Sequence, residues 1–552
     1  MVVVPNSRIR LLKSPIELDN RNQLTFANES AQRTYFLGLP YLEYDNCTYQ
    51  RKDDVIRYET SPNGLTYEDL LGYNYCMYQN TSYDDKWFYA FITDIKYVND
   101  GMTEIKIETD VIQTWKFEIN YKKSFIEREH TNNDTIGANL LPEDLDYGEF
   151  VNVNAPVSTA VGLHQYICVI SSKDIGDGAA AFTSKGQLVN NIYNGLQFAF
   201  FEDQGIYSAW YVANKYISYF ETTKGLDMND VLGVFMCPTE IVGSNKNRRS
   251  LWKSGDTELY YYEPTTSTTA TLMETYLVID SYGMAEGYTP VNKKLLCYPY
   301  RYLLATNNTG TSVIYHYEYF NYDPNQHGEN VLQFKTYGGL SQGCSMKCIP
   351  QNYKGTNGDN YIEGINYSKY PIGAWVGDSY TNWLTQNAIN LGVQEVGGYA
   401  KAIVGGGQMV AHDFEGGVSN IAEGIRSIYE VEMDKYQHSF MPAQANGNLN
   451  VGDINFSMTK NQITFYKMSI TSQYASKIDQ FFSMYGYKTH QVKLPNIEGR
   501  LNWNYVKTIG LNITGDIPQK DMQKIKDIFN NGITFWHNPS TFLDYSQSNI
   551  IV

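Results

Sequence analysis

Cysteine is scarce in this sequence, and long apolar runs are absent from it. The 552-residue chain has seven cysteines, and this odd, scattered set is unlike the disulfide framework of a secreted protein. We therefore expect reduced thiols. No run of about 20 apolar residues occurs, so no ordinary transmembrane helix is predicted. The apolar start of the chain reaches Pro5 without the charged beginning of a signal peptide, which predicts a soluble chain made in the cytoplasm.

The motifs of common cofactor and metal sites are also missing. Three consecutive glycines end at Gly407, but Gln408 and Met409 follow them in place of the Lys and Ser or Thr of a phosphate-binding loop. Cys344 and Cys348 could begin a zinc site, yet no second pair of His or Cys follows at a suitable spacing. We expect no catalytic residue, no cofactor and no metal.

Positive charge is in short supply as well. Lys and Arg together number 43, whereas Asp and Glu number 59, and the formal net charge is -16. Such a chain repels phosphate, because binding to nucleic acid normally depends on Lys and Arg that displace counterions. A protein that grips DNA through a basic surface is therefore disfavoured.

Aromatic side chains, in contrast, are abundant. The chain has 48 Tyr and 24 Phe, and aromatic residues suit half-buried pleated surfaces and subunit interfaces. Hydrophobic residues make up 42% of the chain and charged residues 18%, which indicates a folded globular protein. A chain of this length exceeds one hydrophobic core, so roughly two to four domains are expected.

The clearest local pattern is a β-hairpin with arms at 87–98 and 102–115. In the second arm apolar and charged residues alternate, as in Ile105, Lys106, Ile107 and Glu108, which is the period of a strand with one buried face. The residues between the arms, 99–101, read Asn-Asp-Gly and predict the turn. The first arm is apolar on both faces, so we expect one face to meet a neighbouring subunit, with Phe88, Phe91 and Trp115 as interface residues.

The last hundred residues predict an α+β arrangement. Apolar residues at helical spacing between 474 and 485, followed by Gly486, predict one helix, with Ser472 as its cap. Strands are expected at 487–494 and 501–513. A second helix is expected from Pro518 to Asn531 and a last strand at 533–536. Strands with helices on one side give an α+β domain.

The middle of the chain, 131–450, contains many short β-like stretches, such as 166–170, 231–236 and 313–320. We predict that it is mostly β. Between Ala388 and Arg426 the chain is rich in glycine and small residues, which predicts a loop or a loose hairpin.

Several stretches near both ends of the chain form a distinctive set. The strongest runs from KWFYAF at 86–91 through DVIQTW at 110–115. The others are VPNSRIRLL at 4–12, SFIEREH at 124–130, FSMYGYK at 482–488, NYV at 504–506, GDI at 515–517 and FNNGITFWH at 529–537. Together these stretches resemble the tail knob proteins of small Picovirinae-type podoviruses that infect Gram-positive bacteria.

This resemblance implies a mainly β protein with an α+β tube domain, a tail-tube-like β-sheet or barrel with flanking helices. The tube domain would be built from residues 1–130 and 451–552, and residues 131–450 would form an inserted, mostly β knob region. In that family six copies form a ring around a channel for double-stranded DNA, below the upper tail or collar proteins. Because the chain is acidic, such a channel would offer DNA few contacts on which to stall.

The same resemblance implies that a loop of small and apolar residues plugs the lumen and acts at the host membrane. By position the matching loop is 388–426. Its candidate residues are Ala388, Gly397, Gly398, Ala402, Ile403, Val404, Gly405, Gly406, Gly407, Met409 and Val410. Charged residues such as Glu395, Lys401 and Asp413 interrupt it, so one copy could not cross about 30 Å of hydrocarbon as a helix.

Two alternatives remain open. The protein could instead be a tail-associated module that binds or hydrolyses the cell wall, since paired carboxylates suffice for glycoside cleavage. Adjacent acids such as Asp84 and Asp85 point to opposite faces of a strand, however, and no hydrolase motif is present. His130, between Glu129 and Thr131, could be an acid–base group, but we favour a surface or interface role for it.

Overall fold

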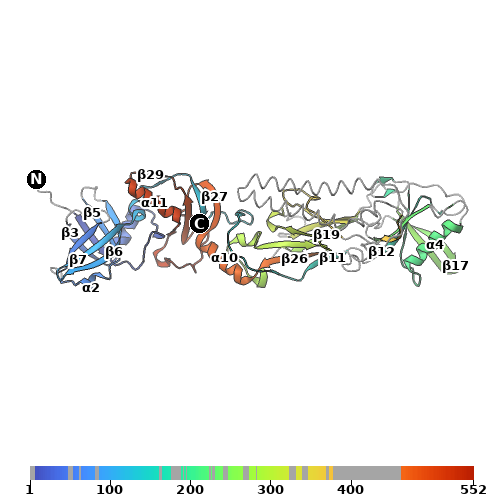
Figure 1. The fold of residues 1–552 in the computed structure, drawn as a ribbon, viewed down its shortest axis with the longest axis horizontal. Coiled ribbons are helices and arrows are strands. Elements are labelled where there is room, and N and C mark those ends of the chain that lie inside the picture. Colours follow the sequence, from blue (N-terminus) through green and yellow to red (C-terminus); the bar gives the residue numbers. More distant parts are fainter. Residues whose placement is uncertain are drawn as a thin grey trace. The chain divides into compact units, whose positions relative to one another are not determined.

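The computed structural model (Figure 1) describes most of both ends of the chain and separate parts of its middle. The described residues are 7–47, 54–60, 64–80, 86–160, 165–173, 175, 188–189, 192–193, 196–222, 226, 230–239, 246–264, 273–280, 283–321, 331–338, 346–367, 372–376 and 462–552.

The chain divides into two compact units. Unit 1 comprises Met1–Leu145, Val291–Lys294 and Ser476–Val552, and unit 2 comprises Asp146–Pro290 and Leu295–Ala475. Both ends of the chain therefore belong to unit 1. The short segment Val291–Lys294 also belongs to it, although unit 2 residues flank this segment on both sides.

The first sheet of unit 1 is antiparallel, with the strand order β3-β1-β5-β6-β7-β4. Its strands are β1 (Ser7–Leu12), β3 (Tyr41–Cys47), β4 (Val55–Glu59), β5 (Tyr75–Asn80), β6 (Trp87–Asn99) and β7 (Met102–Thr109). The two edge strands approach each other, because the ring centroids of Tyr44 on β3 and Tyr58 on β4 are 5.5 Å apart. The sheet thus curls towards the barrel shape that we expected.

The predicted hairpin is present as β6 and β7, but its second arm is shorter than predicted. The strand ends at Thr109, and helix α3 (Val111–Trp115) follows it. Asp110 causes this change, since its side chain accepts hydrogen bonds from the backbone N–H groups of Ile112 and Gln113 and caps the helix. The prediction of a strand up to residue 115 is therefore wrong.

The second sheet of unit 1 joins the two ends of the chain in the order β2-β30-β28-β9-β27. Its strands are β2 (Asn22–Leu24), β9 (Ser124–Glu129), β27 (Tyr487–Lys493), β28 (Trp503–Ile509) and β30 (Ile533–Trp536). A two-stranded sheet pairs β8 (Asn120–Tyr121) with β29 (Ile513–Thr514). Besides α3, the described α-helices of unit 1 are α1 (Glu29–Leu37), α2 (Tyr67–Leu70), α11 (Gln519–Asn531) and, from Ser476 on, α10 (Ser472–Tyr485).

The C-terminal elements lie close to their predicted positions, with one exception. The strand predicted at 501–513 ends at Ile509, because Gly510 breaks it with φ 73, and Ile513 belongs to β29 in another sheet. Helix α11 buries Ile525, Ile528 and Phe529, as the helical spacing predicted. Helix α10 starts at Ser472, so this residue is its first residue rather than its cap. Gly486 ends that helix with φ +64, and a Cβ there would lie 2.1 Å from the backbone oxygen of Glu129, so only glycine fits.

Strand β6 is covered on both faces within unit 1. Phe88 and Ala90 pack in one core with residues of β1, β7 and α11, whereas Trp87 and Tyr89 pack in a second core with Phe36, Trp503 and Trp536. The apolar character of both faces of this arm is therefore explained inside one subunit.

In its described residues unit 2 is mostly β, as predicted, and these residues form three main sheets. One has the order β17-β18-β15-β12-β16-β25, with β12 (Gln165–Ser171), β15 (Gln197–Phe201), β16 (Val231–Pro238), β17 (Lys246–Ser254), β18 (Thr257–Pro264) and β25 (Ile372–Val376), and helix α4 (Ala209–Thr222) packs on it. The second contains β10 (Phe150–Asn152), β11 (Val157–Ala160), β20 (Arg301–Thr306), β21 (Ser312–Tyr315) and β26 (Gln462–Ile470). The third contains β19 (Met273–Asp280), β22 (Val331–Gly338), β23 (Met346–Pro350) and β24 (Ile365–Asn366), and β13 (Leu188–Val189) pairs with β14 (Ile192–Tyr193) outside these sheets.

One predicted strand of unit 2 is too long. The stretch 313–320 forms β21 only to Tyr315 and then a 3-10 turn at Tyr317–Tyr319. Within the described residues, no helix has both the length and the apolar character needed to cross a membrane.

Candidate functional site

The predicted lumen-plug residues lie outside the described part of the chain. Residues 377–461 are not described, and they contain the whole stretch from Ala388 to Arg426. The last described strand before this stretch is β25 and the first after it is β26, and the two belong to different sheets of unit 2. The role of this loop stays a prediction.

The three predicted interface residues differ in exposure. Phe88 and Trp115 are each 8% exposed and contact each other edge to face, with ring centroids 5.9 Å apart. The indole N–H of Trp115 also donates to the carboxylate of Asp521 on α11, at 2.9 Å. Phe91 is only partly buried, against Tyr75. Since unit 1 itself covers Phe88 and Trp115, Phe91 is the one of the three with surface to offer a neighbour.

His130 lies in the core of unit 1, so a surface role for it is wrong. Its Nδ1 accepts the backbone N–H of Tyr505 at 2.8 Å, and its Nε2 lies 3.1 Å from the backbone oxygen of Ser483. Burial, together with the nearby Arg500 and Arg128, lowers the pKa of His130 to about 3. The ring is therefore neutral at neutral pH and joins two segments of the C-terminal part of the chain to β9.

The described residues show no group of three or more His, Cys, Asp and Glu side chains that could hold a metal ion. Cys348 is a free, buried thiol on β23, and burial raises its pKa to about 12. Cys344 lies outside the described residues.

The most elaborate polar arrangement of unit 1 surrounds the segment Val291–Lys294, which we name the anchor segment. Asp479 on α10 holds its first half: one carboxylate accepts the backbone N–H groups of Val291 at 2.8 Å and Asn292 at 2.9 Å. The side-chain amide of Asn292 donates to the same carboxylate at 2.8 Å and to the hydroxyl of Ser483, also at 2.8 Å. Three donors on one buried carboxylate fix the backbone of this segment.

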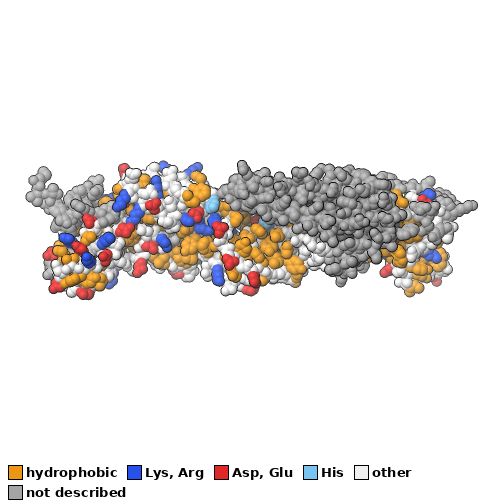
Figure 2. Space-filling view, viewed as in Figure 1, with side chains coloured by type: hydrophobic (Ala, Val, Ile, Leu, Met, Phe, Trp, Pro, Cys, Tyr) orange, Lys and Arg blue, Asp and Glu red, His pale blue; other side chains and the backbone are white. Residues whose placement is uncertain are grey.

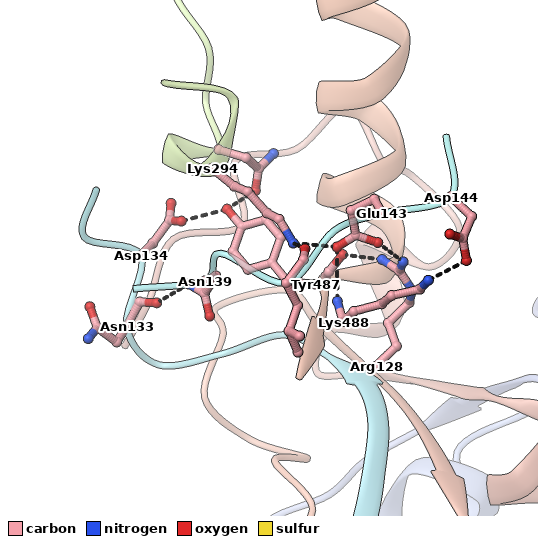
Figure 3. Close-up of polar contacts among 12 residues, drawn as sticks. Arg128, Asn133, Asp134, Asn139, Glu143, Asp144, Lys294, Tyr487 and Lys488 are labelled. Carbon is pink, nitrogen blue, oxygen red and sulfur yellow. Dashed lines mark hydrogen bonds and ion pairs between the residues drawn. The ribbon is translucent and has the colours of Figure 1, made fainter. Parts of the chain in front are cut away.

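Glu143 holds the other end of the anchor segment (Figure 3). Its side chain is fully buried and pairs with the ammonium group of Lys294 at 2.6 Å and with the guanidinium group of Arg128. It also accepts the backbone N–H of Lys488 at 3.1 Å. Lys294 in turn donates to the backbone oxygen of Leu141 at 2.7 Å, and Arg128 donates to that of Gly486 at 2.7 Å. We call Glu143, Lys294, Arg128 and Asp479 the anchor cluster.

Tyr487 lies between the two halves of the anchor cluster. Its hydroxyl donates to Asp134 at 2.5 Å and lies 3.4 Å from the side-chain oxygen of Asn292 (Figure 3). Burial, followed by the negative charge of Asp134, raises the pKa of Tyr487 far above its usual range. The hydroxyl therefore stays protonated and acts as a hydrogen-bond donor.

The anchor cluster has the chemistry of a clamp rather than of a catalyst. Every charged group in it is paired or hydrogen bonded, and none is a nucleophile beside a base. It joins five stretches of chain: β9, the segment after β9, the anchor segment, α10 and β27. The residues next to it in sequence, 145–146, 294–295 and 475–476, are those at which the chain passes between the units.

Sequence reasoning missed the anchor cluster. Glu143, Lys294 and Asp479 are single charged residues in three distant segments, and no motif connects them. The one available signal was the presence of single charged residues among apolar or turn-like neighbours. This signal is weak, because most such residues lie in solvent.

Comparison with known proteins agrees with this architecture. The family model for the C-terminal domain of tail knob protein gp9 of Bacillus phage phi29 matches residues 259–550. The chain belongs to this tail knob protein family. A second model, for the N-terminus of caudoviral major tail proteins, matches residues 5–122.

Full-length tail knob proteins are similar along almost the whole chain. Tail knob protein gp9 of Bacillus phage B103 is 26% identical, over 95% of both chains. Those of Bacillus phages PZA and phi29 are each 25% identical, over 97% of this chain and 98% of theirs. The solved tail knob protein gp12 of bacteriophage C1 has the same fold, with a TM-score of 0.59 and 15% identity over 99% of this chain and 100% of that one.

The expected family is thereby confirmed, as is the mainly β fold with a tail-tube-like part. This tail knob protein is a structural component of the virion, located in the phage tail.

Proposed function

We propose that this tail knob protein forms a ring of six identical subunits at the distal end of the tail, below the upper tail or collar proteins. Unit 1 would be the tube domain and unit 2 the knob. The observation that carries this proposal is the shared core of unit 1, where β1, β5 and β6 from one end of the chain pack with β28, α11 and β30 from the other. A tube domain closed in this way allows a large knob to be inserted in the middle of the chain.

The channel of this ring would let double-stranded DNA pass without binding it. The net charge of -16 per chain supports this idea, because an acidic lumen offers phosphate no counterion-releasing partner. On the face that Figure 2 shows, acidic and basic side chains are interspersed over the described surface instead of forming a basic stripe. In the proposed ring, Phe91 supplies part of the contact with a neighbouring subunit.

The anchor cluster would fix the tube domain to the chain segments that lead into the knob. Three of the segments that it holds run directly into unit 2 residues: the one ending at Leu145, the anchor segment itself, and α10. A paired and buried clamp keeps these segments in place while DNA passes.

The first experiment is to measure the mass of the purified protein by light scattering and to image it by negative-stain electron microscopy. We expect a ring or short tube with a mass near six times 63.1 kDa and a central hole wide enough for a duplex. A monomer that stays monomeric when the upper tail is added would refute the ring.

The loop at 388–426 is proposed to plug the lumen and to act at the host membrane, through several copies together, since charges such as Lys401 interrupt a single one. Phage carrying a deletion of this loop should adsorb normally and deliver less DNA, measured as ejection into lipid vesicles and as plaque formation. Undiminished delivery by the deletion phage would remove the loop from the ejection step.

We propose a purely structural role, without an enzymatic step. Purified ring incubated with Gram-positive cell walls is then expected to release neither sugar nor peptide. Sustained release would favour the alternative of a wall-hydrolysing tail module.

A further inference from the structure

Unit 1 contains a cavity of about 400 Å³ that no step of the proposed function uses. One wall is the segment after β9 and the other is strand β27. The lining residues are Thr131, Asn132, Asn133, Ala138, Asn139, Leu140, Leu141, Lys488, Thr489, Gln491 and Lys493. A volume of this size is typical of sites for small organic ligands.

The lining of this cavity has an unusual chemistry for so acidic a chain. It contains two lysines and no aspartate or glutamate, although acids outnumber bases in the whole sequence. The remaining polar groups are amides and hydroxyls, which both donate and accept hydrogen bonds. No aromatic ring lines it, so a ligand would be held by hydrogen bonds and charge rather than by stacking.

The amide groups of the loop wall are oriented by the loop itself. The side-chain oxygen of Asn133 accepts the backbone N–H and the hydroxyl of Thr135, at 3.0 and 2.8 Å. That of Asn132 accepts the side-chain amide of Asn496 at 2.7 Å. The oxygens are thus engaged, which leaves the N–H donors of both amides for a ligand. Figure 3 shows Asn133 and Asn139 on this loop, together with Lys488.

Lys488 and Lys493 differ in how firmly they are held. Lys493 pairs with Glu129, whose side chain is fully buried. Its ammonium group therefore balances a buried carboxylate and is not available to a ligand. Lys488 pairs with Asp144 at 2.5 Å, and the side chain of Asp144 is 91% exposed. The carboxylate of this pair lies in solvent, where ion pairs contribute little to stability, so a ligand anion can replace Asp144.

We propose that this cavity binds a sugar that carries an anionic group such as phosphate. The anion takes the ammonium group of Lys488 from Asp144, and the sugar hydroxyls bond to the side-chain amides of Asn133, Asn139 and Gln491. The hydroxyl oxygen of Thr131, whose proton is donated to the backbone oxygen of Asn133, accepts from the sugar as well. Binding therefore competes with the ion pair between Lys488 and Asp144. Asp144 directly precedes Leu145, the last residue of the first segment of unit 1.

The test uses the full-length protein in isothermal titration calorimetry with glucose 1-phosphate, glucose and inorganic phosphate as probes. We expect glucose 1-phosphate to bind more tightly than either of the others. Lys488→Met should weaken it about tenfold or more, and Asp144→Asn should tighten it roughly two- to fivefold because Lys488 is then released. Lys488→Met keeps the backbone N–H that bonds Glu143, so the anchor cluster is left intact.

Lys520→Met, on helix α11 and outside the cavity lining, is the matched control and should leave binding unchanged. Equal affinity for glucose would overturn the anion part of the proposal, and equal affinity for inorganic phosphate would overturn the sugar part. Unchanged binding by Lys488→Met would overturn the site itself. Thermal unfolding of each variant beside the parent protein separates loss of binding from loss of fold.

Discussion

Glu143→Ala is expected to destabilise unit 1 by about 3–5 kcal/mol, because it removes one partner from a buried ion cluster. Lys294 and Arg128 would then lose the carboxylate that they share, although their side chains are only 4% and 11% exposed. The backbone N–H of Lys488 would also lose its acceptor. Urea unfolding measures the change in the free energy of unfolding. Hydrogen exchange of the peptides that cover α10 and β27 shows whether the change is located around the anchor cluster.

Two variants test whether the cost comes from burial. Glu127→Ala is the control, because Glu127 lies on the same strand as Arg128 and pairs with Lys507 at 2.8 Å, at a site where both side chains are partly exposed. It should cost about 0–1 kcal/mol. Replacing Lys294 by Met in the Glu143→Ala background should recover part of the loss, since a buried charge that has lost the carboxylate of Glu143 is removed.

The anchor segment gives this experiment a second readout. Exchange of the amides of Val291 and Asn292 should quicken in Glu143→Ala, because the segment then loses the ion pair between Lys294 and Glu143. If those amides and the free energy of unfolding both stayed at parent values, Glu143 would not be a clamp residue, and the anchor cluster would have no part in fixing the segments that lead into unit 2.

Local pattern was enough to predict much of unit 1. The alternation in β7 and the helical spacing of α11 gave the right elements, because in both cases one face of a regular element packs on a core. The error at residues 110–115 has a local cause too. A single capping carboxylate, Asp110, outweighed the strand character of the residues that follow.

Tertiary features were beyond a single sequence. The apolar residues on both faces of β6 were interpreted as a subunit contact, but they face two separate cores, one of which contains Trp503 and Trp536 from the other end of the chain. His130 was placed at the surface because its neighbours in sequence are charged. In the folded protein Glu129 pairs with Lys493 and Arg128 with Glu143, and the imidazole between them is buried. The partner of Glu129 lies hundreds of positions away in the sequence, and that of Arg128 lies 15 residues on, in a segment without regular secondary structure.

His130 leads to the second large expectation, a loss of stability in acid. Its pKa in the folded chain is about 3, below the usual value of 6.5, so the unfolded chain binds the proton more tightly. The stability that the neutral ring contributes is complete above about pH 6.5 and is lost as the pH falls towards 3. Since one pKa unit corresponds to about 1.4 kcal/mol, the full loss is on the order of 5 kcal/mol.

Two other buried groups titrate in the same range, and they act in opposite directions. Burial lowers the pKa of His537 to about 4, which adds to the loss in acid. Burial raises the pKa of Asp110 to about 6, although four hydrogen bonds to its carboxylate oppose this, so its folded form gains stability as the pH falls from 6 towards 4. The net expectation for the parent protein is a loss of roughly 2–4 kcal/mol between pH 7 and pH 4.

His130→Gln separates these contributions. An uncharged amide can still donate to the backbone oxygen of Ser483, but it cannot take up a proton, so its stability should change less between pH 7 and pH 4 than that of the parent. Asp110→Asn should steepen the same profile, because the opposing group is removed. Both profiles are free energies of unfolding, measured in urea at pH 4, 5, 6 and 7. Hydrogen exchange of β28 provides the local readout, because the backbone N–H of Tyr505 donates to the ring of His130. Parallel profiles for the parent and His130→Gln would show that the imidazole binds its proton equally tightly in the folded and the unfolded chain, contrary to the linkage argued here.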